Sequence, residues 1–210
     1  MNRIFCELLC IFFICIVFST SCEKYPIDAL LGLNGSIGAW PDTWYLYDDQ
    51  FNTKGNPNPD VWGDSGDNVD LNLNCTDRPQ SGTKCIKFTW IGNSNNSGKK
   101  DFGFGMRSRD EMDGTIDLTN SGYKYLKFYV RGNLNKNCIL KVEIPESGFG
   151  CSFSSSEITS DWQEEYIDLQ DKSGRKKLND LKYVIGLTLQ TDTVTNGGEV
   201  YIDNIRFTKD

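Results

Sequence analysis

The stretch that decides the fold is residues 200–207, which read VYIDNIRF. Val200 and Ile202 are apolar residues two positions apart, as in a half-buried β-strand. The next apolar pair is Ile205 and Phe207, so the alternation changes parity between the two pairs. A straight strand would turn one pair towards water. We therefore predict a β-bulge at Asp203 and the residue after it, which keeps both pairs on the core.

Short alternating runs, separated by turns rich in Gly, Asn, Pro and Asp, precede this closing strand. The helical pattern is confined to a short segment near residues 176–180, which we interpret as a turn. Such a series of strands indicates an all-β fold, an antiparallel β-sandwich of the jelly-roll type. The predicted strands are 44–51, 69–74, 85–91, 101–107, 125–131, 138–144, 162–169, 184–189 and 200–207.

The N-terminus has the layout of an export signal. Arg3 supplies a positive charge, and residues 8–18 (LLCIFFICIVF) form an apolar run too short to span a bilayer. Small polar residues then lead to Cys22, which resembles the bacterial lipoprotein signal, in which this cysteine is lipidated. The alternative is an ordinary secretory signal.

These features predict three segments: a signal peptide over 1–21, a lipid-anchored tether over 22–40, and a sandwich domain over 41–210. Acyl chains on Cys22 would hold the protein at a membrane without a transmembrane helix. We expect an exported monomer, lipid-anchored in the bacterial cell envelope at the outer membrane or the cell surface.

Four cysteines lie beyond the N-terminal segments: Cys75, Cys85, Cys138 and Cys151. Export favours disulfides, and local pairing predicts Cys75 with Cys85 and Cys138 with Cys151, because each pair brackets a turn-like segment. The chain contains neither a histidine nor a CxxC spacing, which speaks against a zinc site. Four unpaired thiols are the remaining alternative.

The charge balance and the absence of histidine exclude several classes of function. The net charge is −7 and the sequence contains no basic stripe, so the chain is a poor candidate for nucleic-acid binding. Without histidine, nucleophilic systems of the Ser-His or Cys-His kind are excluded. A glycosidase would need two opposed carboxylates, and no motif selects such a pair.

Four segments occur in the order typical of a known fold: SGTKCIKFTW, IDLTNSGYKYLKFYVRGN, DWQEEYIDL and GEVYIDNIRF. Together they resemble the galactose-binding-like jelly roll, which many carbohydrate-binding modules and the complex I assembly-factor family share. The resemblance implies a non-catalytic, carbohydrate-binding lipoprotein whose partner is a polysaccharide or oligosaccharide. Because one fold hosts many functions, an envelope protein-interaction or assembly component and a small glycan-active enzyme are the alternatives.

The resemblance also implies a structural calcium ion. In modules of this kind calcium often lies between the first and last strands, with an aspartate of the closing strand as one ligand. Asp203 matches that aspartate, and Asp48 or Asp49 after the first strand would supply another carboxylate. Calcium takes six to eight oxygen ligands, and backbone carbonyls of the turns could complete the set. The alternative is that Asp203 accepts hydrogen bonds from backbone amides of the bulge.

Outward strand positions supply the candidate ligand-binding residues. Planar hydrogen-bonding groups and aromatic rings hold sugars, and positive residues would suit acidic glycans. Gly103, Gly105 and Gly186 share the outward parity and leave space beside them. Trp62, in a Gly- and Asp-rich loop, is either a sugar platform or a residue that packs back onto the core. The candidates on strands are Arg107, Tyr129, Arg131, Glu143 and Gln190.

Overall fold

The computed structural model describes residues 40–51, 60–62, 68–91, 100–107, 115–170, 176–191 and 198–210. Asp42–Asp210 forms one compact unit. The predicted signal segment, the tether and Cys22 lie outside the described residues. Within the described residues we find only strands, turns and irregular segments, and none of these is a helix that could cross a membrane.

In the described parts of the chain, twelve strands form two antiparallel sheets. In the seven-stranded sheet the order is β10-β7-β12-β1-β2, with β5 beside β12 and β4 beside β5. The first strand and the last strand are therefore neighbours. The strands of the seven-stranded sheet are β1 (Thr43–Asp48), β2 (Gln50–Phe51), β4 (Asn68–Cys75), β5 (Cys85–Ile91), β7 (Tyr125–Asn133), β10 (Gln163–Asp168) and β12 (Gly198–Thr208).

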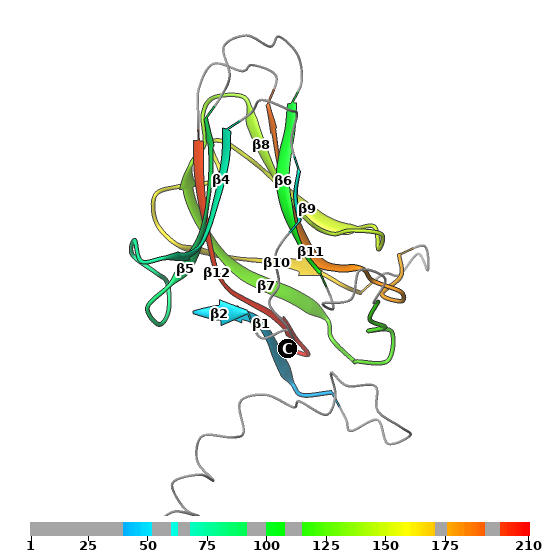
Figure 1. Ribbon diagram of the computed structural model, residues 1–210. Coiled ribbons are helices and arrows are strands. Elements are labelled where there is room, and N and C mark those ends of the chain that lie inside the picture. The colour runs from blue at the N-terminus through cyan, green and yellow to red at the C-terminus, as the bar shows by residue number, and fades with distance from the viewer. Residues whose placement is uncertain are drawn as a thin grey trace, which may run out of the picture. The chain divides into compact units, whose positions relative to one another are not determined.

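The five-stranded sheet has the order β3-β6-β11-β8-β9. Figure 1 shows β4, β5 and β12 on one side of the molecule and β6 and β11 on the other. The sequence is therefore correctly read as an all-β sandwich. The strands of this sheet are β3 (Asp60–Trp62), β6 (Lys100–Arg107), β8 (Cys138–Ile144), β9 (Phe149–Ser154) and β11 (Tyr183–Thr191).

The core lies between the two sheets. Phe88 of β5 packs against Phe104 of β6, with ring centroids 5.6 Å apart, and Phe128 of β7 meets Phe153 of β9 at 6.4 Å. All four side chains are buried. Because alternate residues of a strand point to opposite faces, the neighbours of these phenylalanines point away from the core.

The closing strand β12 contains the predicted bulge. Its register with β7 shifts between Asp203 and Arg206, and Asn204 has a positive φ of 50°. Asparagine tolerates this left-handed conformation better than most residues. The extra residue restores the inward parity after the bulge, so Val200, Ile202, Ile205 and Phe207 are all buried.

Two strands were not predicted. Trp62, which the sequence placed in a loop, belongs to the three-residue edge strand β3, where it lies opposite Gly103. Residues 149–154, to which the sequence analysis assigned no strand, form β9, which pairs with β8 across a short turn. The strand β3 pairs with β6, about forty residues later, so local composition did not reveal it. The predicted first strand 44–51 is divided into β1 and β2, which pair with each other across Asp49.

The strand β9 also shows that one predicted disulfide is wrong. Its register places Cys151 opposite Val142, four residues from Cys138 along β8. At the rise of a strand this separation is about 13 Å, whereas a disulfide needs Cα atoms within about 7 Å. Cys75 and Cys85, in contrast, lie directly opposite each other in the pairing of β4 with β5. The structure joins none of these cysteines by a disulfide.

Candidate functional site

The candidate ligand-binding residues on strands lie on two different sheets. Arg107, Glu143 and Gln190 belong to the five-stranded sheet, whereas Tyr129 and Arg131 belong to β7 of the seven-stranded sheet. All five occupy outward positions, and the outward faces of two packed sheets point away from each other. One binding face therefore cannot hold all five.

The outward side of the five-stranded sheet carries a patch without side chains, which we call the glycine face. Gly105 lies opposite Gly186, and Gly103 lies opposite Thr188, in the pairing of β6 with β11. Gly150 of β9 lies opposite Glu143. At Gly150 a Cβ atom would lie 3.0 Å from the Cβ of Glu143, so this position favours glycine. Gly103, Gly105 and Gly186 are themselves buried, as is Thr188, whereas Gly150 is exposed, so the accessible part of this face lies on its β8 and β9 side.

Polar side chains surround these glycines. The register of β11 with β8 places Glu143 opposite Gly186, Lys141 opposite Thr188 and Ile139 opposite Gln190. Lys141, Glu143 and Gln190 are each partly exposed. This arrangement presents an amine, a carboxylate and an amide along one side of a flat backbone surface, which is suited to bonding the hydroxyl groups of a ligand.

A hydrogen-bonded triad borders the glycine face at β3. The Arg107 guanidinium donates to Asp60 from Nε to Oδ2 at 3.0 Å and from Nη2 to Oδ1 at 3.1 Å. The Tyr183 hydroxyl donates to Oδ2 of the same carboxylate. Partial burial would raise the pKa of Asp60, but the hydrogen bonds from Tyr183 and Arg107 outweigh it and lower that pKa. The carboxylate therefore stays ionised near neutral pH.

The triad contains two residues that the sequence analysis missed. Asp60 precedes Trp62 in a segment with the composition of a loop, and Tyr183 is the first residue of β11. The bond to Asp60 raises the pKa of Tyr183, since the phenol proton is shared with a carboxylate. Only the pairing of β3 with β6 and of β6 with β11 brings the three residues together. The Trp62 side chain lies outside the described part of the chain.

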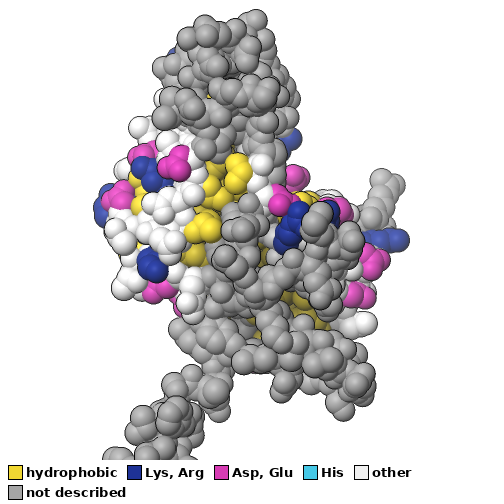
Figure 2. All heavy atoms as spheres, in the orientation of Figure 1, with side chains coloured by type: hydrophobic (Ala, Val, Ile, Leu, Met, Phe, Trp, Pro, Cys, Tyr) yellow, Lys and Arg dark blue, Asp and Glu magenta, His cyan; other side chains and the backbone are white. Residues whose placement is uncertain are grey.

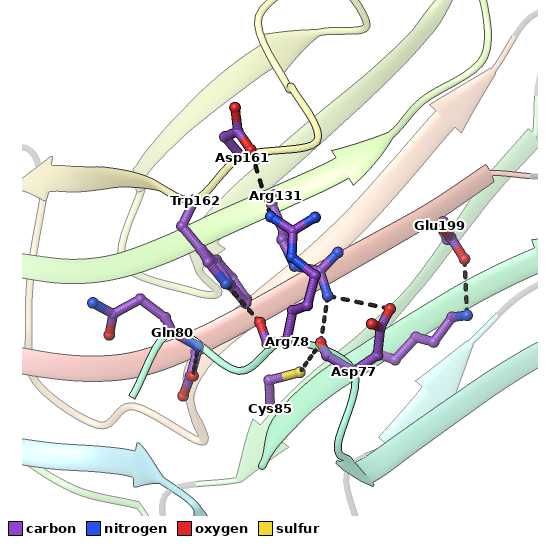
Figure 3. A network of polar contacts seen from close by, with 10 residues as sticks. Asp77, Arg78, Gln80, Cys85, Arg131, Asp161, Trp162 and Glu199 are labelled. Carbon is purple, nitrogen blue, oxygen red and sulfur yellow. Dashed lines mark hydrogen bonds and ion pairs between the residues drawn. The ribbon is translucent and has the colours of Figure 1, made fainter. Parts of the chain in front are cut away.

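Arg131 is not available to a ligand. A loop between β4 and β5, residues 76–84, lies over the outward side of the seven-stranded sheet and covers this side chain, which is 5% exposed (Figure 3). The guanidinium lies 3.6 Å from the centroid of the Tyr201 ring and 5.0 Å from that of Trp162. It donates to the backbone carbonyl of Asp77, and Trp162 donates to that of Arg78 at 2.8 Å. Arg131 thus holds the loop.

Tyr129 is partly exposed on the same sheet as Arg131. The Arg206 guanidinium lies over its ring, 5.6 Å from the centroid, and forms an ion pair with Glu164. Tyr129 therefore belongs to a separate group of side chains, on the side of the sandwich opposite the glycine face.

The three predicted calcium ligands meet at the loop 76–84. Asp203, fully buried, accepts the backbone amides of Gln80 at 2.8 Å and Ser81 at 3.2 Å through Oδ2. Its Oδ1 accepts the amide of Asn204 at 2.7 Å. The alternative to calcium binding was that Asp203 accepts hydrogen bonds from backbone amides, and these bonds are of that kind. Burial raises the pKa of Asp203 more than these amide bonds lower it.

Asp49 and Asp48 also bond to this loop. Asp49 Oδ1 accepts the amides of Thr83 at 2.6 Å and Lys84 at 2.7 Å, and Asp48 accepts the Ser81 hydroxyl at 3.2 Å. The described residues contain no cluster of three acidic or cysteine side chains arranged to hold a metal ion. A calcium ion would have to share carboxylate oxygens with amide hydrogens, which repel a cation. Calcium binding stays a prediction.

We compared the chain with known proteins. No family model matches it, and no curated protein matches it. Among solved structures it is similar to the family 11 carbohydrate-binding module of the cellulosomal cellulase Lic26A-Cel5E of Clostridium thermocellum, at 15% identity and a TM-score of 0.47. That alignment covers 81% of this chain and 96% of the module.

Two further solved structures are similar. The family 11 module from Clostridium thermocellum in complex with a β-1,3-1,4-mixed-linked tetrasaccharide has 16% identity and a TM-score of 0.45, over 79% of this chain and 95% of that one. The family 30 module of the cellulosomal cellulase Cel9D-Cel44B of Clostridium thermocellum has 18% identity and a TM-score of 0.46, over 80% of this chain and 98% of that one.

Proposed function

We propose that the protein binds a carbohydrate, without catalysis, on the glycine face of its five-stranded sheet. The observation that carries this proposal is the group of partly exposed polar side chains Lys141, Glu143 and Gln190, with Glu143 between Gly186 of β11 and the exposed Gly150 of β9. A sugar ring is flat and carries hydroxyl groups at its edge. The exposed backbone at Gly150 leaves room for the flat side, and the neighbouring amide, amine and carboxylate bond to the hydroxyls.

The other outward face supports the choice. Over the middle of the seven-stranded sheet, the loop 76–84 already occupies the surface around Arg131 and Tyr201. A ligand there would have to displace the loop, and would break its bonds to Asp203 and Asp49. The glycine face requires no such displacement of that loop.

We also propose that the protein acts at the bacterial cell envelope, anchored by lipid on Cys22. This part rests on the layout of residues 1–22 alone. Mass spectrometry of the protein from its native host tests it: acyl chains on Cys22 are expected, and an unmodified Cys22 thiol would contradict it.

The binding site is tested by glycan-array binding followed by single substitutions. Glu143→Ala and Gln190→Ala should each weaken binding about tenfold, the value of one or two lost hydrogen bonds. Tyr129→Ala, on the opposite sheet, is the matched control and should leave the affinity unchanged. Loss of binding in the control alone, or silence across a broad array with folded protein, would contradict the proposal.

A further inference from the structure

The sequence assigned its outward arginines to the binding of acidic glycans, and the structure places neither where that role needs it. Arg131 lies under the loop 76–84. Arg107 does border the glycine face, but a carboxylate of the same face engages its guanidinium through two parallel hydrogen bonds. Such a bidentate pair is the strongest and most directional contact that an arginine makes with a carboxylate.

The pair between Arg107 and Asp60 is braced on both sides. Tyr183 donates its hydroxyl to Asp60, and its ring lies under the Arg107 guanidinium at 5.9 Å. Asp60 comes from the edge strand β3, so this ion pair also joins the side chains of β3 to those of β6 and β11. The Arg107 side chain is 21% exposed and that of Asp60 is 36% exposed, so a ligand on the face could reach both.

The remaining charges of the glycine face are also of both signs. Lys141 and Glu143 are two residues apart on β8, so they share one face. Lys182 lies beside Tyr183, with its amine 5.9 Å from the ring centroid. Acidic and basic side chains are likewise interspersed over the side of the molecule shown in Figure 2. The face therefore carries Asp60 and Glu143 among Arg107, Lys141 and Lys182, so an anionic sugar meets carboxylates as well as cations.

We infer that Asp60 is a specificity-determining residue: by neutralising Arg107 it makes the glycine face select uncharged glycans over carboxylated ones. This inference rests on the proposed function. A uronic acid brought to Arg107 meets the Asp60 carboxylate at the same guanidinium, and like charges at that distance repel. An uncharged sugar can hydrogen-bond to the outer atoms of the pair without this repulsion.

The test uses Asp60→Asn, which keeps the size and one acceptor oxygen but removes the negative charge. Wild type and variant are compared by affinity electrophoresis against a neutral glucan, a neutral mannan, polygalacturonate and alginate. Wild type should bind a neutral polymer at least about tenfold more tightly than either acidic one, and Asp60→Asn should bind an acidic polymer about tenfold more tightly than wild type does. That gain should disappear when Arg107→Gln is added to Asp60→Asn.

The matched control is Glu164→Gln, which removes the carboxylate partner of Arg206 on the opposite sheet and changes the net charge equally. It should behave as wild type. Wild-type binding of an acidic polymer as tight as that of the neutral ones overturns the inference without need of any variant. An equal gain in Glu164→Gln, or no gain in folded Asp60→Asn, overturns it as well. If wild type and every variant bind none of the four polymers, the proposed function fails and the inference falls with it.

Discussion

Arg131 and Arg107 are both arginines at outward strand positions, and their surroundings give them different roles. Arg131 lies between two aromatic rings beneath a loop, where a guanidinium contributes cation–π attraction and a charged hydrogen bond. Arg107 stands at the border of the glycine face and pairs with Asp60. The first therefore stabilises the fold, and the second is in a position to affect ligand choice.

Replacing Arg131 tests its role as the anchor of the loop. Arg131→Ala should lower the free energy of unfolding by about 2–4 kcal/mol, because a buried charged hydrogen bond and two ring contacts are lost. The control is Arg78→Ala in the same loop, whose ion pair with Asp161 has side chains 62% and 85% exposed. That change should cost less than about 1 kcal/mol. Denaturant unfolding measures both, and equal losses would contradict the anchor.

Asp60 should give the protein an acid-sensitive contribution to stability. Its pKa is lowered in the folded protein, so the contribution is present above the ordinary carboxyl pKa and is lost as the pH falls through the lowered value. The melting temperature of Asp60→Asn should therefore fall less than that of wild type below about pH 4. Thermal melts between about pH 7 and pH 2 give the comparison, and parallel curves would refute it.

At the scale of elements, β4, β5 and the loop 76–84 between them form one unit. Cys75 and Cys85 close the base of the loop, and both are buried. Backbone amides at its tip donate hydrogen bonds to Asp49, which follows β1, and to Asp203 of β12. Gly82 has a positive φ of 59°, and a Cβ atom there would lie 2.1 Å from an oxygen of Asp49. The loop can therefore close over the carboxylate only with glycine at this position.

The register of β4 with β5 predicts a disulfide between Cys75 and Cys85. Opposed residues of antiparallel strands have Cα atoms roughly 4.5–5.5 Å apart, within the range that a disulfide requires. In an oxidising compartment the bond should form and stabilise the fold by about 2–3 kcal/mol. Peptide mapping without reductant should find this link and no link between Cys138 and Cys151. Four unmodified thiols in protein from an oxidising compartment would disprove it.

In reduced protein the thiols of Cys85 and Cys151 should react slowly with alkylating reagents. Burial and the neighbouring Cys75 raise the pKa of Cys85 to about 12, and burial raises that of Cys151 to about 12. The thiolate is the reactive form, so little of it exists near neutral pH. Alkylation of the native, reduced protein is therefore expected only after local opening.

At the scale of the whole molecule, β12 joins the parts. It pairs with β7 along one edge and with β5 and β1 in succession along the other. The bulge at Asp203 lies between these two partners, which is where the carboxylate meets the loop 76–84. One buried aspartate thus connects the last strand to the covering loop.

Calcium removal tests whether that connection needs a metal ion. The amide donors around Asp203 and Asp49 already satisfy their oxygens, so we expect the same melting temperature in calcium and in chelator. Asp203→Ala should lower the melting temperature equally in both. A rise with calcium in wild type that Asp203→Ala abolishes would establish the structural calcium site instead.

The sequence by itself determined most of the strands, though not β3 or β9, together with the bulge in β12 and the inward residues of the strands it predicted. These features depend on the local alternation of apolar and polar residues, which is a property of the sequence and independent of the tertiary structure. It also correctly indicated the all-β sandwich, because so many short strands have few other ways to bury their apolar sides. Residues 1–22 remain a prediction, as they lie outside the described residues.

Only the tertiary structure decided which outward residues share a face. Parity places Arg107 and Tyr129 outward but cannot say that they belong to opposite sheets, because sheet membership is set by pairing between distant segments. The same cause hid Asp60 from the candidate site, whereas the register of the local β8–β9 hairpin separates Cys151 from Cys138. It also hid the burial of Arg131, since the loop that covers this residue lies about fifty residues earlier in the chain and reaches it only in the folded state.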